Sequence, residues 1–448
     1  MPEKSFSLHN SSLIKPYNKK IEVDSDKSLS IRSFLIGAIS QDVSEINNVL
    51  ESEDVFSTIK CLKKLGIQIK KKAPKLYNVH GKGLGSFIAK KNLQLNFGNS
   101  GTLARLLIGI LSTTPNLEVN ICGDHSLNKR NMKKLINLMS EFGAEFRPKN
   151  KFNFPLKLIS TEMPVGIMYK SGVSAQLKSA VLLAGLNSFG ITKIIEEKKS
   201  RDHSENLLQK NSQTIQIKKG KKKLINIIGK KYLEPIKINI PGDASSAAFF
   251  TALTVMNKKS SLIIKKVGLN PTRIGFYELL KKHGAKIKFR NIKKNNNEIY
   301  GDVEVKSHKI KPIRASKEFY VKATDEYPIL FVIAALTSGI SIFKGIDGLA
   351  NKESDRIKEM QRILKQVGIK TKASKSAVKI FGKDFIKSKN KTISVPNLGD
   401  HRICMSALIL SLLTGTKVKI KNFETVYTSS PSFLKIIKIL GGRFEIKK

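Results

Sequence analysis

One arrangement of residues occurs six times along this chain. In each copy a small polar cluster leads into an apolar segment that is typical of a buried helix; the fifth predicts a helix over Ile329–Gly339. The marker residues of the copies, which lie 72, 74, 71, 80 and 75 residues apart, are Ser28, Ser100, Ser174, Ser245, Asp325 and Asp400. This period is longer than that of solenoid repeats, so it favours compact α/β units over a stacked array.

A second series of segments interleaves with the first. Each member is an amphipathic helical pattern that ends at a glycine and leads into a short strand. The pattern predicts a sixth helix end near Asn211, because asparagine can replace glycine in the left-handed position after a helix. The five glycines are Gly66, Gly143, Gly284, Gly368 and Gly441. The chain is therefore predicted to contain six copies of a unit with two helices and several strands.

The six copies divide into two groups of three. A chain of 448 residues is too long for one hydrophobic core. The third copy ends near Ile240-Pro241-Gly242. We therefore predict two α/β (α+β) domains, residues 25–241 and residues 1–24 plus 242–448, and we expect the strand-like segment within 1–24 to complete the sheet of the second domain.

The chain carries a large excess of positive charge. It has 81 Lys and Arg against 35 Asp and Glu, which gives a formal net charge of +46. Such a charge suits a polyanionic partner: nucleic acid, an anionic membrane or phosphorylated small molecules. The cations are mostly lysines spread along the whole chain, which indicates a compositional drift on solvated faces. We therefore give weight to individual cations near helix starts rather than to the total.

Other features of the composition exclude several classes of protein. Cys61, Cys122 and Cys404 are isolated and the seven His are scattered, so neither a disulfide framework nor a metal site is expected. Residues 1–16 lack the apolar core of a signal peptide. The longest strongly apolar run, Ile329–Leu336, has eight residues, far fewer than the ~20 that span a bilayer. We expect a cytoplasmic protein with no membrane partner.

Two helix starts have the composition of anion sites, because a helix N-terminus presents free N–H groups and a partial positive charge. The first is Asp26-Lys27-Ser28-Leu29-Ser30-Ile31-Arg32, where two cationic and two hydroxyl side chains lie at the predicted helix start. The alternative is that Ser28 or Asp26 simply caps the helix. In Gly98-Asn99-Ser100-Gly101-Thr102, a glycine loop between a strand and a helix would let N–H groups approach a phosphate. A tight turn capped by Ser100 is the alternative.

A third charged cluster, Lys352-Glu353-Ser354-Asp355-Arg356, lies at the head of another helix. Ordinary surface pairing between neighbouring charges would explain it. Its position where a loop enters a helix, in the same half of the chain as Asp325 and Arg402, favours a functional role.

Taken together, the motifs resemble those of the enolpyruvyl transferases, specifically the EPSP synthase (3-phosphoshikimate 1-carboxyvinyltransferase) family. Nine motifs occur in the family's order over nearly the whole chain: Asp-Lys-Ser-x-Ser-x-Arg, Gly-Asn-x-Gly-Thr, the Arg130 loop, Ser-Ala-Gln, Arg-Asp-His, Gly-Asp-Ala-Ser-Ser, Asp-Glu-Tyr-Pro, Lys-Glu-Ser-Asp-Arg and Asp-His-Arg. The resemblance implies two globular domains, each of three βαβαββ units, with the active site in the cleft between them.

The resemblance also implies a reaction. The enolpyruvyl group of phosphoenolpyruvate would be transferred to the 5-hydroxyl of shikimate 3-phosphate, with release of phosphate, in the route to chorismate and the aromatic amino acids. No metal and no nucleotide cofactor would be needed, and no nucleic acid would be bound. We expect a monomer.

Site residues follow from the resemblance position by position. Asp325 would take the proton of the hydroxyl, and either Glu353 or Lys27 would move the proton at C3. The residues implied to bind shikimate 3-phosphate are Lys27, Ser28, Arg32, Ser174, Ala175, Gln176, Arg201, Asp325 and Lys352. The residues implied to bind phosphoenolpyruvate, mainly by fork-like guanidinium pairing, are Lys27, Gly101, Arg130, Gln176, Arg356 and Arg402.

The chain departs from the commoner family pattern in places. Thr428-Ser429-Ser430-Pro431 lies where many members have a lysine, and the Ser-Ala-Gln motif points to a branch that lacks this lysine. Ala350-Asn351 replaces the more usual Arg-Val, and Leu106 replaces a common proline. Gly101 leaves the phosphoenolpyruvate pocket free of a methyl group, so we expect inhibition by glyphosate.

Three alternatives compete with this function. A UDP-N-acetylglucosamine enolpyruvyl transferase would have a cysteine five residues before Arg130, where this chain has His125; Cys122 lies eight residues before it. A basic nucleic-acid-binding protein fits the charge, but the chain has no tryptophan, no aromatic residues interleaved with its lysine runs and no recognised binding module. An inactive scaffold would not need the full set of charged site residues.

Overall fold

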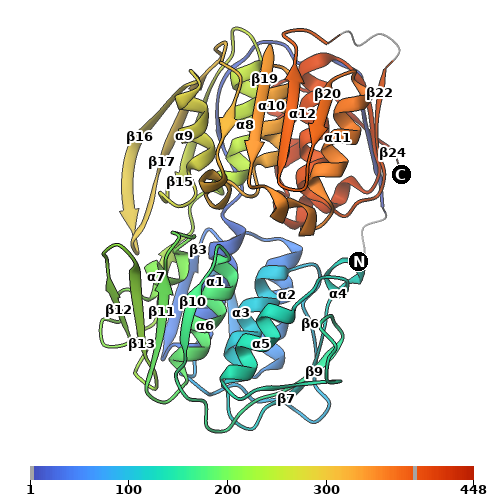
Figure 1. Cartoon of the computed structure of the whole chain (residues 1–448). Helices are drawn as coiled ribbons and strands as arrows, with labels where there is room; N and C mark the ends of the chain where they lie inside the picture. Colours follow the sequence, from blue (N-terminus) through green and yellow to red (C-terminus); the bar gives the residue numbers. More distant parts are fainter. Residues whose placement is uncertain (1–4, 387–390, 448) are drawn as a thin grey trace. The chain divides into compact units, whose positions relative to one another are not determined.

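The structure is a computed structural model that describes residues 5–386 and 391–447. The chain divides into two compact units (Figure 1). The 25–240 unit comprises Ser25–Ile240 and Lys294–Glu298, and the 241–448 unit comprises the described parts of Met1–Asp24, Pro241–Lys293 and Ile299–Lys448. Residues 1–4, 387–390 and 448, which belong to the second predicted domain, lie outside the described residues.

In the part of the chain that the structure describes, six four-stranded sheets share one pattern, three in each unit. In every sheet one edge strand runs parallel to its neighbour, and that neighbour pairs antiparallel with the next strand. One copy occupies a continuous run of chain: β6 (Gln94–Asn96), α3 (Gly101–Ser112), β7 (Glu118–Cys122), α5 (Lys133–Glu141), β8 (Glu145–Arg147) and β9 (Leu156–Ile159). This order is βαβαββ, and the six sheets confirm the predicted fold class.

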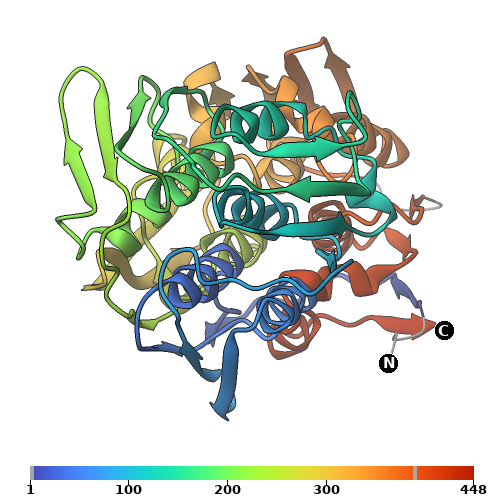
Figure 2. The same cartoon turned by 90° about the horizontal axis from the view of Figure 1, so that it is seen from below.

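The 25–240 unit takes the first strand of its first sheet from its own end, since β14 pairs in parallel with β3. In the view of Figure 2, the strands of this unit surround its helices. Its remaining elements are α1 (Lys27–Ile39), β3 (Val43–Asn47), α2 (Glu53–Lys64), β4 (Gln68–Ala73), β5 (Leu76–His80), α4 (His125–Asn128), β10 (Met168–Ser171), α6 (Ala175–Leu186), β11 (Ile191–Glu196), α7 (His203–Leu208), β12 (Ile215–Lys218), β13 (Lys223–Ile228) and β14 (Lys237–Asn239).

The 241–448 unit takes two strands from the start of the chain. β2 pairs in parallel with β15, and β1 lies between β23 and β24. The elements of this unit are β1 (Ser7–Asn10), β2 (Asn18–Glu22), α8 (Ala244–Met256), β15 (Ser261–Gly268), α9 (Gly275–Lys282), β16 (Lys286–Asn295), β17 (Glu298–Lys306), β18 (Arg314–Ala315), the 3-10 helices η1 (Lys317–Lys322), η2 (Asp347–Asn351) and η3 (Phe423–Thr428), α10 (Tyr327–Ala335), β19 (Gly339–Lys344), α11 (Arg356–Gln366), β20 (Lys370–Ala373), β21 (Ala377–Gly382), β22 (Thr392–Val395), α12 (His401–Thr414), β23 (Lys417–Ile420), α13 (Phe433–Ile439) and β24 (Glu445–Lys447).

The apolar first helix of each copy lies at the centre of its unit. Helices α8, α10 and α12 pack against one another, and α3 packs against both α1 and α6. Every residue of α10 is buried. These helices are apolar on all sides because other helices and sheets surround them. Charged side chains enter the interior near the starts of some of these helices, as Lys27 and Arg32 do on α1 and Arg402 does on α12.

Two local predictions need correction. The fifth helix ends at Ala335 rather than at Gly339, because Gly339 has a φ of +113° and begins strand β19. Asn211 is not among the residues with positive φ; its side chain donates to the carbonyl of Leu208 (3.4 Å) and accepts from the backbone N–H of Glu234 (2.9 Å). The five predicted glycines do adopt positive φ after their helices.

Residues 5–386 and 391–447 contain neither a membrane-spanning helix nor a metal cluster. No helix there combines the length and apolar character needed to cross a bilayer. No group of three or more His, Cys, Asp or Glu side chains there could hold a metal ion. The three cysteines are buried free thiols.

Candidate active site

The first turn of α1 is organised by side chains. Asp26, not Ser28, caps the helix, since its carboxylate accepts from the N–H of Leu29 (2.8 Å). Lys27 forms an ion pair with Asp54 of α2 (Nζ to Oδ2 3.0 Å), and its side chain is 19% exposed. The partial positive charge of the helix start and the ammonium group therefore lie together, as an anion would require.

Arg32 lies one turn further along α1 and is buried. Its guanidinium donates to the hydroxyl of Ser28 and, through Nε, to the hydroxyl of Ser204 (2.9 Å). A longer contact joins Nη2 to Ser179 of α6 (3.4 Å). Arg32 thus ties the starts of α1 and α7 to the side of α6, which fixes the direction of its charge.

The first turn of α3 has a close approach of two arginines. Ser100 caps the helix (3.2 Å to the N–H of Leu103). A Cβ placed on Gly101 would lie 2.7 Å from Nη1 of Arg105 and 2.9 Å from Nη1 of Arg130. Glycine at this position therefore lets two guanidinium groups approach the helix start.

Gln176 connects this arrangement to α6. Its amide oxygen accepts from Nη1 of Arg105 (2.9 Å), and its amide nitrogen donates to the hydroxyl of Thr102 (3.0 Å). Ser174 caps α6 and Ala175 is its first residue. We use "helix-start cluster" for the predicted residues that lie at or beside these three first turns of the 25–240 unit: Lys27, Ser28, Arg32, Gly101, Arg130, Ser174, Ala175 and Gln176.

Arg201 lies in the loop between β11 and α7. The loop is fixed one residue earlier, where both the N–H and the hydroxyl of Ser200 donate to the carboxylate of Glu196 (3.0 and 2.7 Å). Burial would raise the pKa of Glu196, but the charge of Lys178 and the bonds from Lys178 and Ser200 lower it overall.

Arg356 is the centre of a second cluster, in the 241–448 unit. Its side chain is 2% exposed, and its Nε and Nη2 both donate to the buried carboxylate of Asp400 (2.9 and 3.3 Å). Nη2 also donates to Glu353 (2.7 Å), and Nη1 lies 3.7 Å from Asp325. Burial alone would lower the pKa of Arg356, but the charges of Asp400, Glu353 and Asp325 raise it, so the guanidinium stays charged.

Arg402 differs from Arg356 because, among the described residues, no carboxylate forms a hydrogen bond with its buried guanidinium. The residue is 5% exposed, and its Nε and Nη1 have no hydrogen-bond partner in the part of the chain that the structure describes. The guanidinium lies 5.7 Å from the centre of the Phe249 ring. A buried charge with unused donors is costly, so this position is suited to an anionic ligand.

Two carboxylates of this cluster reach solvent. The side chains of Asp325 and Glu353 are 24% and 19% exposed, and both contact Arg356. Lys352 immediately precedes Glu353, between η2 and α11. We use "arginine–carboxylate cluster" for Asp325, Glu353, Arg356, Asp400 and Arg402. The structure thus places Asp325 and Glu353, the carboxylates predicted to be catalytic, beside Arg356.

Sequence reasoning missed three residues that lie in these clusters or contact them. Asp400 marked a repeat and began the Asp-His-Arg motif, but no site role was predicted for it. It caps α12 and holds Arg356. Arg105 follows Gly101 by four residues, a spacing that places both on one face of α3 and could have revealed it. Asp54 of α2 forms an ion pair with Lys27 of α1, and no local sequence pattern predicts this contact between the two helices.

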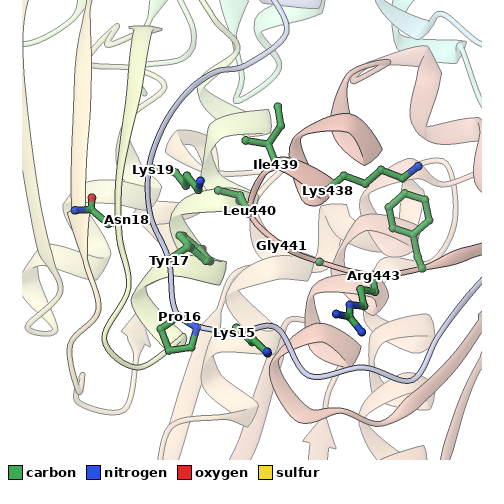
Figure 3. A pocket seen from close by; sticks show the side chains of 12 residues that line it. Lys15, Pro16, Tyr17, Asn18, Lys19, Lys438, Ile439, Leu440, Gly441 and Arg443 are labelled. Carbon is green, nitrogen blue, oxygen red and sulfur yellow. The ribbon is translucent and has the colours of Figure 1, made fainter.

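A separate pocket of about 860 Å³ lies in the 241–448 unit (Figure 3). Its walls are the segments 15–19 and 438–444, with the side chains of Lys15, Lys19, Lys438 and Arg443 around it. None of the residues predicted for the site lines this pocket, so it does not belong to either cluster.

Known proteins resemble the whole chain. Residues 12–437 match the EPSP synthase (3-phosphoshikimate 1-carboxyvinyltransferase) family. The 3-phosphoshikimate 1-carboxyvinyltransferase of Zymomonas mobilis is 36% identical over 435 residues, which cover 96% of each chain. The enzyme of the same name from Petrotoga mobilis is 38% identical over 423 residues, covering 94% of this chain and 96% of the relative.

Solved structures agree. An EPSP synthase from Acinetobacter baumannii superposes with a TM-score of 0.85 at 32% identity, covering 99% of this chain and 100% of the other. The enolpyruvyl transferase NikO from Streptomyces tendae, at 13% identity, shares the fold with a TM-score of 0.78 over 99% of this chain and 98% of its own. The nine motifs, the six repeated sheets and these full-length matches agree: the chain belongs to the EPSP synthase family.

Proposed function

We propose that this chain transfers the enolpyruvyl group of phosphoenolpyruvate to the 5-hydroxyl of shikimate 3-phosphate, giving 5-enolpyruvylshikimate 3-phosphate and phosphate. In the addition step the hydroxyl oxygen bonds to C2 of phosphoenolpyruvate, the hydroxyl proton goes to a base, and C3 gains a proton. In the elimination step C3 loses a proton and the C2–O bond to phosphate breaks. Both steps require two anionic substrates held in one geometry and groups that move protons.

Each cluster supplies part of what the reaction needs. We propose that Lys27, Ser28, Arg32, Ser174, Ala175, Gln176, Arg201, Asp325 and Lys352 bind shikimate 3-phosphate, and that Lys27, Gly101, Arg130, Gln176, Arg356 and Arg402 bind phosphoenolpyruvate. Asp325, which is partly exposed, takes the hydroxyl proton. Glu353 or Lys27 exchanges the proton at C3.

The observation that carries this proposal is a set of buried arginine donors without hydrogen bonds among the described residues. Arg402 has two buried N–H-bearing nitrogens without an acceptor among the described residues, and Nη1 of Arg356 also has no hydrogen bond there. Because the Nε and Nη2 atoms of Arg356 already bind Asp400 and Glu353, only Nη1 can turn to a substrate. A small molecule with a carboxylate and a phosphate would satisfy both arginines.

Phosphate release tests the proposal. Wild-type protein should release phosphate from phosphoenolpyruvate only when shikimate 3-phosphate is present, and Lys27→Ala should lower turnover by about 100-fold or more, as loss of a proton-transfer group does. Asp54→Asn, which breaks the same ion pair but keeps the ammonium group, should cost less. Lys60→Ala, an exposed lysine on α2, serves as the control. Turnover with UDP-N-acetylglucosamine instead of shikimate 3-phosphate would overturn the proposal.

The thiol nearest the Arg130 loop argues against that alternative substrate. Cys122 is buried at the end of β7, where its sulfur lies 3.7 Å from the carbonyl oxygen of Leu95 and 3.5 Å from the amide nitrogen of Gln94. His125, at the position where the alternative enzyme has its cysteine, begins α4. No thiol is therefore placed in this loop to act as an acid.

We further propose that residues 25–241 and 1–24 plus 242–448 are the two folding domains, and that the chain works as a monomer in the cytoplasm, without a cofactor, a nucleic acid or a membrane as partner. Light scattering on the eluting protein would test the monomer: a mass near 49.9 kDa is expected, and twice that value would contradict it.

A further inference from the structure

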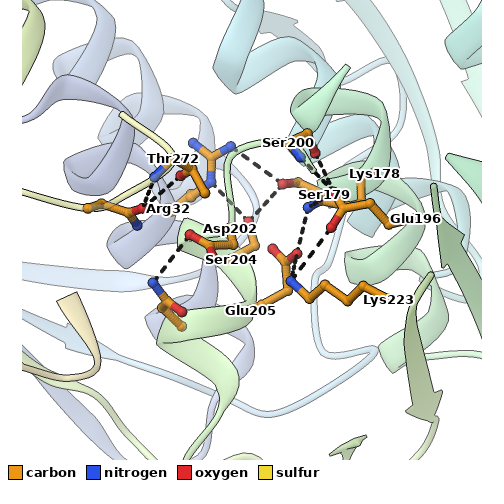
Figure 4. Close-up of polar contacts among 12 residues, drawn as sticks. Arg32, Lys178, Ser179, Glu196, Ser200, Asp202, Ser204, Glu205, Lys223 and Thr272 are labelled. Atoms are coloured by element: carbon orange, nitrogen blue, oxygen red, sulfur yellow. Dashed lines mark hydrogen bonds and ion pairs between the residues drawn. The ribbon is translucent and has the colours of Figure 1, made fainter. Parts of the chain in front are cut away.

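A charged network is buried behind the helix-start cluster, and the proposed chemistry does not use it (Figure 4). Lys178 of α6 is fully buried, and its Nζ lies 2.7 Å from Glu196 of β11 and 2.6 Å from Glu205 of α7. Lys223 of β13 approaches the same two carboxylates from the partly exposed side (3.8 and 3.2 Å). Two cations and two anions thus form a neutral group inside the 25–240 unit.

The network is continuous with Arg32. Lys178 and Ser179 are consecutive on α6, and Ser204 and Glu205 are consecutive on α7. One link between the helices is the ion pair of Lys178 and Glu205, and the other is the hydrogen bond from the hydroxyl of Ser204 to that of Ser179 (2.8 Å). The guanidinium of Arg32 donates to both hydroxyls of the second link. Any change in the spacing of α6 and α7 therefore moves the two acceptors of Arg32.

The same network also fixes the backbone that leads into Arg201. Glu196 accepts from Lys178 and, with the same oxygen, from the N–H and hydroxyl of Ser200. Arg201 is the next residue in the chain. The position of its backbone therefore depends on a carboxylate whose own position Lys178 sets.

A buried salt bridge is a poor source of stability, since apolar residues of similar volume often serve as well. Buried ions can instead fix the orientation of the groups that they contact, because each hydrogen bond restricts the angle as well as the distance between two groups. In this network the oriented groups are the two hydroxyl acceptors of Arg32 and the backbone next to Arg201. Both arginines are in the set proposed to bind shikimate 3-phosphate.

We propose that Lys178, Glu196 and Glu205 are positioning residues that hold Arg32 and Arg201 in the geometry that receives the phosphate group of shikimate 3-phosphate. The inference rests on the proposed function. It adds three residues that do not touch the substrate but determine its affinity.

Lys178→Met is the test, because methionine is unbranched, keeps most of the length of the side chain and removes its charge. The KM for shikimate 3-phosphate should rise by about tenfold or more, because misplaced binding groups lose affinity steeply. The kcat and the KM for phosphoenolpyruvate should change by less than about threefold, since a binding defect confined to one substrate leaves the other interactions intact. Calorimetric titration of shikimate 3-phosphate alone should show the same loss of affinity.

Lys222→Met is the matched control. Lys222 and Glu197 are the sequence neighbours of Lys223 and Glu196. They form an ion pair as short as that of Lys178 and Glu196 (2.7 Å), but their side chains are 58% and 54% exposed. Exposed pairs contribute little, so this variant should have the KM values of the wild type. If Lys178→Met does not fold, the double variant Lys178→Met/Glu205→Gln keeps the network neutral through Glu196 and Lys223 and takes its place.

Ser204→Ala completes a double-mutant cycle, because it removes one acceptor of Arg32 without altering any charge. If Lys178 acts through that hydroxyl, the losses of affinity in Lys178→Met and Ser204→Ala will be less than additive in the double variant. A folded Lys178→Met protein, or its double-variant replacement, with a KM for shikimate 3-phosphate within about twofold of wild type would overturn the inference, as would equal losses for both substrates. Failure of the wild type to turn over shikimate 3-phosphate would instead refute the proposed function.

Discussion

Replacing Asp400 by asparagine isolates the interaction that holds the arginine–carboxylate cluster together. The carboxylate is fully buried and accepts from Nε and Nη2 of Arg356, from the hydroxyl of Ser354 (2.9 Å) and from the N–H of Arg402 (3.0 Å). Asparagine has the same shape and caps a helix equally well. Its amide nitrogen, however, must face a donor in either orientation, because both oxygens of Asp400 accept from N–H groups.

The expected loss in the free energy of unfolding depends on the contacts that Arg356 keeps in the variant. Removing one partner of a buried ion pair lowers the free energy of unfolding by about 3–5 kcal/mol. Arg356 keeps its bond to Glu353 (2.7 Å) and its contact with Asp325 (3.7 Å), so we expect the lower end, about 3 kcal/mol. For a domain of about 150–250 residues each kcal/mol shifts Tm by about 2–4 °C, which gives a decrease of about 6–12 °C.

Differential scanning calorimetry of wild type, Asp400→Asn and Asp384→Asn measures this effect. Asp384 pairs with Lys309 on the surface, where the side chains are 55% and 79% exposed, so its variant should keep the Tm of the wild type. The KM for phosphoenolpyruvate should also rise in Asp400→Asn, because the amide displaces both arginines. A Tm for Asp400→Asn as high as that of the control would refute the claim that Asp400 anchors Arg356.

Three further predictions concern other parts of the chain. Gly101→Ala should raise the KM for phosphoenolpyruvate and the glyphosate concentration that halves turnover, because the new methyl group would lie 2.7 Å from Arg105 and displace it; unchanged values for both would contradict this. Because its folded pKa is lowered, Glu196 should stabilise the protein above the unfolded pKa of about 4.5 and lose that contribution as the pH falls below it; urea unfolding of Glu196→Gln should show lower stability at pH 7 and a flatter decline below pH 4.5. Burial raises the pKa of Cys61 to about 12, so at pH 8 this thiol should react with a disulfide reagent only after unfolding, as peptide mass spectrometry would show.

Local chemistry was the part of the fold that the sequence could predict. Ser100, Ser174 and the five glycines mark helix ends through bonds within a few residues of themselves, so their roles can be deduced without tertiary structure. The predicted helix end near Asn211 is confirmed, since α7 ends at Leu208, but the predicted left-handed conformation of Asn211 is wrong. Its amide oxygen accepts from the N–H of Glu234, a residue 23 positions away, and such a partner leaves no trace in a local pattern.

For the candidate site, too, the sequence predicted the residues but not their long-range contacts. Residue type and helix position predict which side chains carry charge at each first turn, and the structure places those side chains there. What they contact depends on residues far along the chain: Asp400 is 44 positions from Arg356, and Ser204 is 172 positions from Arg32. The sequence could therefore indicate the members of each cluster but not the bonds that orient them.

Arg356 and Arg402 show what that difference means for mechanism. Sequence reasoning gave both arginines one role, fork-like pairing with phosphoenolpyruvate. In the structure the Nε–Nη2 edge of Arg356 is already used by Asp400, while the Nε and Nη1 of Arg402 have no acceptor in the described residues. We therefore infer that Arg402 provides most of the anion binding and that Arg356 mainly orients Asp325 and Glu353, the two carboxylates proposed to move protons. An arginine that holds one carboxylate by a hydrogen bond and another by an ion pair contributes to kcat. An arginine with unused donors contributes to binding, so the two variants should differ in their kinetics although the arginines share a motif type.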